Sequence, residues 1–422
     1  MIKLANVPLI FEVRKSEDRE SMRVHRVLEI GLGLALAGVA ACLAQSTALP
    51  QNQRQTALAL EQQGKNTEAE IAWRAILKTH PANPEPYAHL GLLEARQERY
   101  QEAISLYRKA LALDPSFPAL RLNLGLALFK AGEMQEAILI FKPLLKSQPP
   151  SSPEAQRLTI LLGMAHYAQS QFAEAAPYLK QAAAADPKNL GLRLSLAHSC
   201  LWSKQYQCVL DTYHEILLLN AESAEADMLA GEAMDEMKDH NGAIQQFRAA
   251  VKANPREPNA HFGLGYLLWT QRQYAEAATE LQAELDNAPN HVQALLYLAD
   301  SQLQLSHPEA ARTLCEKVLQ LDAGLELAHL DLGILYADAG HQDDALREMR
   351  DAARLAPEDV NVHWRLGRLL RSMGKKDEAK AEFDKASSIT KAVDTALIDK
   401  MKPADAGSGP DRKPAAEPEH KQ

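Results

Sequence analysis

Histidines are the side chains in this sequence that most suggest chemistry, because there are 14 of them and imidazole is a common metal ligand. His261, His329 and His363 lie 68 and 34 residues apart, which places them at one position of a repeating unit. In adjacent helical units such positions are about 10 Å apart, roughly the diameter of a helix, and too far to share an ion. We therefore expect these histidines to pack helices, and we predict no metal site.

Catalytic and nucleotide-binding motifs give no better result. Gly31-Leu32-Gly33 begins like a dinucleotide-binding loop, but it lies inside an apolar run with no strand before it. The sequence contains no phosphate-binding loop, no H-E-x-x-H and no G-x-S-x-G. A net charge of −9 without a basic, aromatic-interleaved stripe disfavours nucleic acid. We predict a protein that is not an enzyme, needs no cofactor and binds no nucleic acid.

A repeating unit is seen most clearly in residues 84–117. Apolar and small residues fall there in two groups at helical spacing, with a polar break at 97–99 between them. The groups are Tyr87, Leu90 and Gly91, then Ala103, Tyr107 and Ala110. The pattern predicts a helix–turn–helix unit of 34 residues.

The pattern returns ten times between residues 50 and 393, with one four-residue insertion, Ser152 to Ala155, that we expect to lengthen a loop. A small residue late in the first helix, Ala at the start of the second and Pro after it recur at this period. This arrangement resembles the tetratricopeptide repeat. The resemblance implies an all-α fold: a right-handed α-solenoid superhelix of about ten repeats.

Glycine recurs inside the first helices, although it costs about 1 kcal/mol relative to Ala there. We expect close approach of the paired helix to offset this cost, and we place Ala277 and Ala345 at such contacts. Helices of this length are marginal alone in water, so neighbouring units must stack into one core.

Residues 1–49 precede the repeats and resemble a bacterial export signal. A basic stretch starts at Met22, which we take as a candidate true start, so that residues 1–21 would precede the translated chain. An apolar run from Ile30 to Ala44 follows. Three interpretations stay open: a lipoprotein signal with lipid on Cys42, an ordinary cleaved signal, or an uncleaved anchor. Each predicts an exported protein, either periplasmic or membrane-anchored and facing the periplasm.

Residues 394–422 follow the repeats. Helical register continues to Met401, and we expect this helix end to cap the stack before a disordered tail. Of the remaining cysteines, Cys315 falls at a core position. Cys200 and Cys208 flank one turn, and whether they pair is left open by the sequence.

The surface that remains for function is one stripe of the first helices, found by stepping 100° per residue. In tetratricopeptide proteins this stripe lines the concave groove that binds peptides. The candidate groove residues are Phe129, Tyr167, Trp202, Glu232, Asp235, Glu236, Phe262, Tyr266, Trp269 and Trp364.

The resemblance and this stripe predict a non-catalytic protein–protein interaction scaffold of the bacterial cell envelope. Its partners would be proteins or peptides with basic and aromatic segments, and it would contact the membrane only through its N-terminal lipid or anchor. Two alternatives remain. The repeats could regulate an enzyme acting in trans, such as a glycosyltransferase or peptidase, or the chain could be a self-associating structural protein.

Overall fold

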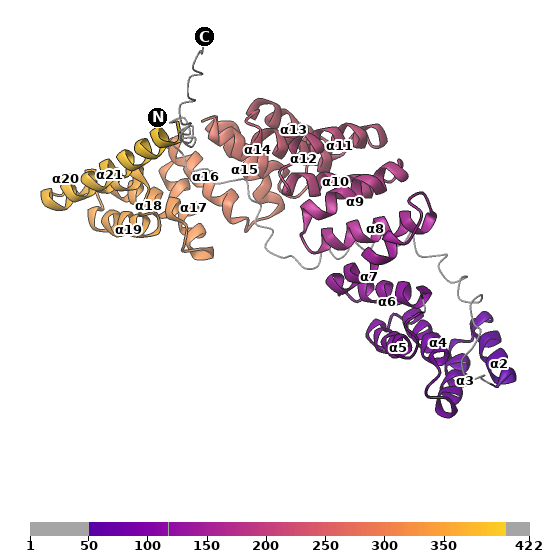
Figure 1. Cartoon of the computed structure of the whole chain (residues 1–422). Helices are drawn as coiled ribbons and strands as arrows, with labels where there is room; N and C mark the ends of the chain where they lie inside the picture. Colours follow the sequence, from indigo (N-terminus) through magenta and orange to yellow (C-terminus); the bar gives the residue numbers. More distant parts are fainter. Residues whose placement is uncertain (1–49, 117, 402–422) are drawn as a thin grey trace, which may run out of the picture. The chain divides into compact units, whose positions relative to one another are not determined.

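The computed structural model describes residues 50–116 and 118–401, with the side chains of 118 and 396–401 left aside. Within these ranges the chain forms twenty helices and no strand (Figure 1). The helices are α2 (Gln51–Gln62), α3 (Asn66–Thr79), α4 (Pro84–Arg96), α5 (Tyr100–Leu113), α6 (Pro118–Lys130), α7 (Met134–Lys146), α8 (Pro153–Ala168), α9 (Phe172–Ala185), α10 (Leu190–Trp202), α11 (Tyr206–Leu219), α12 (Ala224–Glu236), α13 (His240–Ala253), α14 (Ala260–Thr270), α15 (Tyr274–Asn287), α16 (Val292–Gln304), α17 (Pro308–Leu321), α18 (Glu326–Asp338), α19 (Gln342–Leu355), α20 (Val360–Ser372) and α21 (Lys376–Met401).

These helices form pairs in chain order, with α2 and α3 as the first pair and α20 and α21 as the tenth. Even-numbered helices are the first of each pair and odd-numbered helices the second. The prediction of an all-α fold built from helix–turn–helix repeats is therefore confirmed. The described chain divides into two compact units, one up to Leu267 and the other from Leu268, so the division falls inside α14.

Close approach within a pair explains the glycines of the first helices. A Cβ added at Gly91 would lie 2.6 Å from the ring of Tyr107 on the paired helix. At Gly367 it would lie 2.8 Å from the ring of Phe383. Both distances are shorter than a normal carbon–carbon contact, so the expected reason for glycine is confirmed.

Stacking of the pairs produces the core. In the first unit, one cluster of buried residues runs from Ala88 on α4 to Ala233 on α12 without interruption. Second helices supply the largest buried side chains, including Tyr107, Phe141 and Phe247. Each pair therefore buries its apolar faces against its neighbours, as a repeat array requires.

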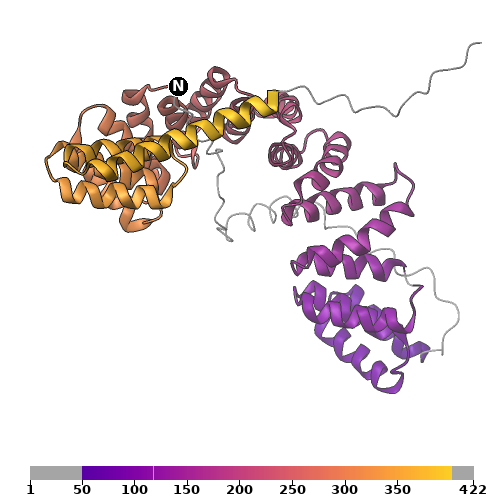
Figure 2. The same cartoon turned by 60° about the vertical axis from the view of Figure 1, so that its left-hand side comes forward.

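Two elements differ from the sequence predictions. The insertion 152–155 is not a longer loop: Ser152 caps α8, accepting the N–H of Ala155 at 3.1 Å, and the inserted residues form its first turn. At the other end α21 runs straight to Met401 (Figure 2), and residues 391–395 are all exposed. Those residues therefore do not cover the end of the stack. The signal segment, with Cys42, and the tail after Met401 lie outside the described residues.

The structure pairs the two cysteines whose bonding the sequence leaves open. Cys200 on α10 and Cys208 on α11 are bonded, with their Cα atoms 5.9 Å apart. Cys315 is a buried free thiol, as its core position predicted.

Two of the recurring histidines bond to the paired helix of their own repeat and to the turn that precedes that repeat. His329 Nδ1 lies 2.8 Å from Glu348 of the paired helix, and its Nε2 lies 3.3 Å from a turn carbonyl, that of Ala323. His363 repeats the arrangement with Glu382 at 2.6 Å and the carbonyl of Pro357 at 2.8 Å. Both ring nitrogens are engaged in helix packing.

Candidate functional site

The turn between α10 and α11 positions Trp202, the one exposed Trp, Tyr or Phe side chain within residues 50–116 and 118–267. The Asn189 side chain caps the start of α10 by accepting the N–H of Leu192. At its end, Lys204 adopts φ 59° and its N–H donates to the carbonyl of Leu201 at 2.9 Å. This left-handed residue reverses the chain, so Trp202, the last residue of α10, lies near Tyr206, the first of α11.

An aromatic cluster surrounds Trp202. Its ring stacks on Phe172 with 6.1 Å between centroids, and Phe172 meets Tyr167 edge-on at 5.7 Å. Tyr167 also meets His198 at 6.4 Å. Trp202 is 38% exposed, whereas the other three are half-buried. We call these four residues the aromatic cluster; they offer partners one exposed indole on a packed base.

An acidic cluster lies on the next first helix, α12, and consists of Glu232, Asp235 and Glu236. Burial, followed by repulsion from Asp235 and then Glu236, raises the pKa of Glu232 to about 8. No Lys or Arg contributes to that shift. Asp235 lies 2.7 Å from the Nδ1 of His240. The cluster therefore concentrates acidic groups with little local cationic compensation.

Hydrogen bonds connect each cluster to a neighbouring helix. His198 Nε2, from the aromatic cluster, lies 3.1 Å from Glu225 in the first turn of α12. The hydroxyl of Tyr206 donates to Glu236 at 3.3 Å. Contacts between α10 and α12 hold the helices side by side. Aromatic and acidic groups from repeats four to six thus form one continuous surface, which we call the aromatic–acidic surface.

Tyr266 extends this surface to α14. It is half-buried, and its pKa is raised by burial and then by the nearby charge of Asp235. Of the predicted groove residues, the structure therefore brings Tyr167, Trp202 and Tyr266 together with the acidic cluster.

Two predicted groove residues are buried instead. Phe129 is 2% exposed and tilts against Phe141 at 6.5 Å, and Phe262 is 4% exposed. Neither presents a surface to a partner, because each fills space between helices. We leave both out of the candidate surface.

Trp269 and Trp364 belong to the second unit and form separate local arrangements. The indole N–H of Trp269 donates to Asp300 at 2.5 Å, and its ring lies 4.7 Å from Tyr297. Trp364 is 46% exposed, with the guanidinium of Arg368 over its ring at 4.9 Å. Neither is part of the aromatic–acidic surface.

Phe172 is the contributor that the first-helix stripe does not contain, since it starts a second helix. A recurring signal marks its position: Tyr100, Phe172, Tyr206 and Tyr274 all occupy the same place in their repeats. Phe172, at the start of α9, meets Tyr167 near the end of the preceding first helix, α8. It also stacks on Trp202 at the end of the next first helix, α10.

Membrane and metal chemistry find no support in residues 50–116 and 118–401. Within them no helix combines the length and apolarity that a membrane crossing needs. The same ranges contain no group of three or more His, Cys, Asp or Glu side chains arranged to hold a metal ion.

Comparison with known proteins identifies the repeats. Two family models, both described as tetratricopeptide repeat, match most of the chain, at residues 54–118, 94–159, 166–233, 231–291, 262–326 and 330–390. They describe repeats and indicate no enzyme family.

Individual relatives are distant. Anaphase-promoting complex subunit 3 of Schizosaccharomyces pombe is 22% identical over 188 residues, 44% of this chain and 28% of that protein. BBSome complex member BBS4 of Bos taurus is 25% identical over 232 residues, 52% and 45% of the two chains. The chain thus spans less than half the length of these relatives. A solved tetratricopeptide repeat protein from Parabacteroides merdae is 17% identical with TM-score 0.43, over 64% of this chain and 98% of its own.

Proposed function

The chain belongs to the tetratricopeptide repeat family, whose repeats serve as protein–protein interaction scaffolds, and from this we propose a specific role. The protein is a non-catalytic adaptor of the bacterial cell envelope. It binds segments of other proteins on the aromatic–acidic surface of repeats four to seven.

The observation that carries this proposal is Trp202. A large indole, 38% exposed, sits on a stacked aromatic base, and its helix α10 packs beside α12, which carries the acidic cluster. Tryptophan is the residue most enriched among binding hot spots, and a packed base holds its ring in one orientation before a partner arrives.

Charge defines the partner. The acidic cluster lacks a lysine or arginine among the causes of the Glu232 shift, so a partner's cation would relieve its repulsion. The matching segment carries an apolar or aromatic anchor for Trp202 and a Lys or Arg for Glu232, Asp235 and Glu236.

The envelope location is supported by two features. The sequence before the repeats has the order of an export signal: a basic stretch from Met22, an apolar run, and small residues before Cys42. The Cys200–Cys208 disulfide is of the kind that persists in oxidising compartments such as the periplasm.

Site-specific photo-crosslinking in the native cell tests the surface. A benzoylphenylalanine replaces Trp202 in one strain and Leu218 in a control strain. Leu218 is a matched control because it is also apolar, lies in the same repeat and is 87% exposed on the second helix. We expect a discrete protein adduct from position 202 and not from 218.

The captured partner is then titrated against purified variants. Trp202→Ala should weaken binding by about 2 kcal/mol, a typical hot-spot loss, while Leu218→Ala should leave it unchanged. The triple change Glu232→Gln, Asp235→Gln and Glu236→Gln should mainly slow association and reduce its dependence on salt. Equal affinity for wild type and both surface variants would rule the proposal out.

The rival roles give different results in the same preparation. A self-associating structural protein would show sedimentation that depends on its own concentration, without any partner. A regulator acting on an enzyme in trans would change that enzyme's turnover when the captured partner is the enzyme itself.

A further inference from the structure

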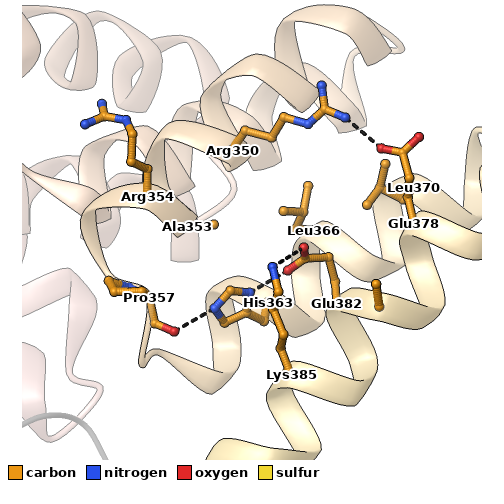
Figure 3. A pocket seen from close by; sticks show the side chains of 11 residues that line it. Arg350, Ala353, Arg354, Pro357, His363, Leu366, Leu370, Glu378, Glu382 and Lys385 are labelled. Carbon is orange, nitrogen blue, oxygen red and sulfur yellow. Dashed lines mark hydrogen bonds and ion pairs between the residues drawn. The ribbon is translucent and has the colours of Figure 1, made fainter.

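The second unit contains a cavity that the first-helix surface does not include. Its volume is about 530 Å³, and it is enclosed by α19, α20 and α21 (Figure 3). Helices α19 and α21 are second helices of repeats nine and ten, so the cavity opens on the second-helix side. Sites that bind ligands commonly have about this volume.

The cavity has an apolar floor. Leu366 and Leu370 of α20 are 3% and 2% exposed, and Ala353 of α19 and Pro357 of the following turn continue the floor. Figure 3 shows Ala353 and Leu366 between the charged side chains of α19 and those of α21. An aliphatic group entering here would exchange water for apolar neighbours.

The rim is cationic. Arg350 and Arg354 stand on the α19 wall and Lys385 on the α21 wall, against two lining carboxylates, Glu378 and Glu382. The lining itself holds three cations and two carboxylates, and each cation is paired with a carboxylate. Arg354 has its partner outside the cavity, at Asp351 on its own helix.

These rim cations are exchangeable. Arg350 pairs with Glu378 at 2.7 Å, Arg354 with Asp351 at 3.1 Å, and Lys385 with Glu382 at 2.8 Å. The three cationic side chains are 54%, 66% and 58% exposed. Ion pairs this exposed contribute little to stability, so a ligand carboxylate can take the place of the protein carboxylate at small cost.

The opposite wall is held in place for binding. Glu382 accepts from His363 and from Lys385, while His363 also contacts the carbonyl of Pro357 at 2.8 Å (Figure 3). This network fixes the side chains of the wall formed by α20 and α21. On the α19 wall, the long side chains of Arg350 and Arg354 stay adjustable.

We propose that this cavity binds an acidic segment of a partner protein, with one aliphatic side chain on Leu366 and Leu370 and flanking carboxylates on Arg354 and Lys385. Charge complementarity specifies the occupant, because cations stand on two facing walls with an apolar floor between them. A single small anion would use only one wall. The site is distinct from the aromatic–acidic surface, which selects the opposite charge.

The test uses the full chain with Leu methyl groups isotopically labelled, because the floor residues then report on binding directly. The probe is a blocked peptide, Glu-Glu-Leu-Glu-Glu. We expect the methyl signals of Leu366 and Leu370, assigned with Leu366→Ile and Leu370→Ile, to shift saturably. Two control peptides, Gln-Gln-Leu-Gln-Gln and Glu-Glu-Ser-Glu-Glu, should bind at least tenfold more weakly.

Matched variants distinguish binding in the cavity from non-specific attraction between charges. The double change Arg354→Gln with Lys385→Gln should weaken the probe about tenfold. Arg347→Gln with Lys380→Gln removes the same charge from the same helices outside the cavity, and should change binding less than twofold. Trp202→Ala should have no effect.

Three results would overturn the proposal. One is the absence of shifts at Leu366 and Leu370 at millimolar peptide. Another is an equal loss in the two double variants, which would mean non-specific attraction. The third is octanoate shifting these methyl signals at lower concentration than the peptide, which would make the site one for fatty anions.

Discussion

Buried carboxyl groups without a cationic hydrogen-bond partner are the most unusual single residues of this chain. Asp331 on α18 is 2% exposed, and its Oδ2 accepts no hydrogen bond. Burial, then repulsion from Asp300, raises its pKa well above the ordinary carboxyl value, against a smaller lowering by Arg365. A buried carboxyl group of this kind stays protonated in the folded protein, and this lowers the free energy of unfolding by an amount that grows with pH.

Replacing Asp331 by Asn should therefore stabilise the protein as pH rises. An acid whose folded pKa is raised binds its proton more tightly when folded, so its contribution falls once pH exceeds the unfolded value near 3.8. Asn copies the neutral form at every pH. We expect its melting temperature to match wild type near pH 4 and to exceed it at pH 8, by about 1 kcal/mol or more in unfolding free energy. Asp338→Asn, on the exposed part of α18, is the control; a parallel pH profile for Asp331→Asn and wild type would refute the assignment.

Under the envelope proposal, Cys42 decides the mode of export. Small residues Val39, Ala40 and Ala41 precede it, as before a lipidated cysteine. We expect cells fed a fatty-acid analogue to label the wild-type protein and not Cys42→Ser. Release of the Cys42→Ser protein into the soluble periplasmic fraction would accompany the loss of label. If wild type takes up no label, an ordinary cleaved signal or an uncleaved anchor replaces this interpretation.

At the scale of elements, the 34-residue period was enough to place nearly every helix. Small residues late in the first helices, and an alanine early in every second helix except α11, which has Val209, mark where two backbones meet, and that contact fixes the register. The start of α8 was missed because Ser152 and Pro153 signal a turn and a helix N-terminus equally well.

Exposure of individual side chains was less predictable. Phe129 and Trp202 hold neighbouring stripe positions, the twelfth and the thirteenth residues of their repeats, and they are 2% and 38% exposed. The difference comes from neighbours: Phe129 lies against Phe141 in the core, whereas Trp202 stacks on the half-buried Phe172. Helical spacing gives the direction of a side chain but not the size of what covers it.

The helix–helix contact of repeat nine can be tested by overpacking. Ala345 is fully buried, and a Cβ on Gly333 would already lie 3.4 Å from its carbonyl oxygen. Ala345→Leu should therefore separate α18 from α19 and cost about 1–3 kcal/mol in unfolding free energy. The control Ala392→Leu, on the exposed end of α21, should leave the melting temperature unchanged. Equal melting of the two variants would show that the register is wrong.

For the whole molecule, the two proposals together predict that partners are selected by charge. The chain carries a net charge of −9, so basic partners are attracted in general. Local sites refine this preference: the acidic cluster beside Trp202 favours cations, while the cavity of the second unit favours anions. A scaffold with two sites of opposite selectivity can hold two different partners, or two segments of one, without competition between them.

Proton uptake by Glu232 should make partner binding depend on pH in a predictable direction. Its pKa is raised from 4.5 to about 8, so it is mainly protonated at pH 6 and ionised at pH 9. Ionisation adds a negative charge to the surface, while a partner's lysines, with pKa near 10.4, stay charged across this range. Affinity for a basic partner should therefore rise about threefold from pH 6 to pH 9, a gain suited to a partly exposed ion pair. Glu232→Gln should abolish the rise. The control Glu222→Gln, which removes an exposed carboxylate just before α12, should retain it. Titrating the partner captured at Trp202 by calorimetry at both pH values decides the matter, and a rise of the same size in Glu232→Gln would place the titrating group elsewhere.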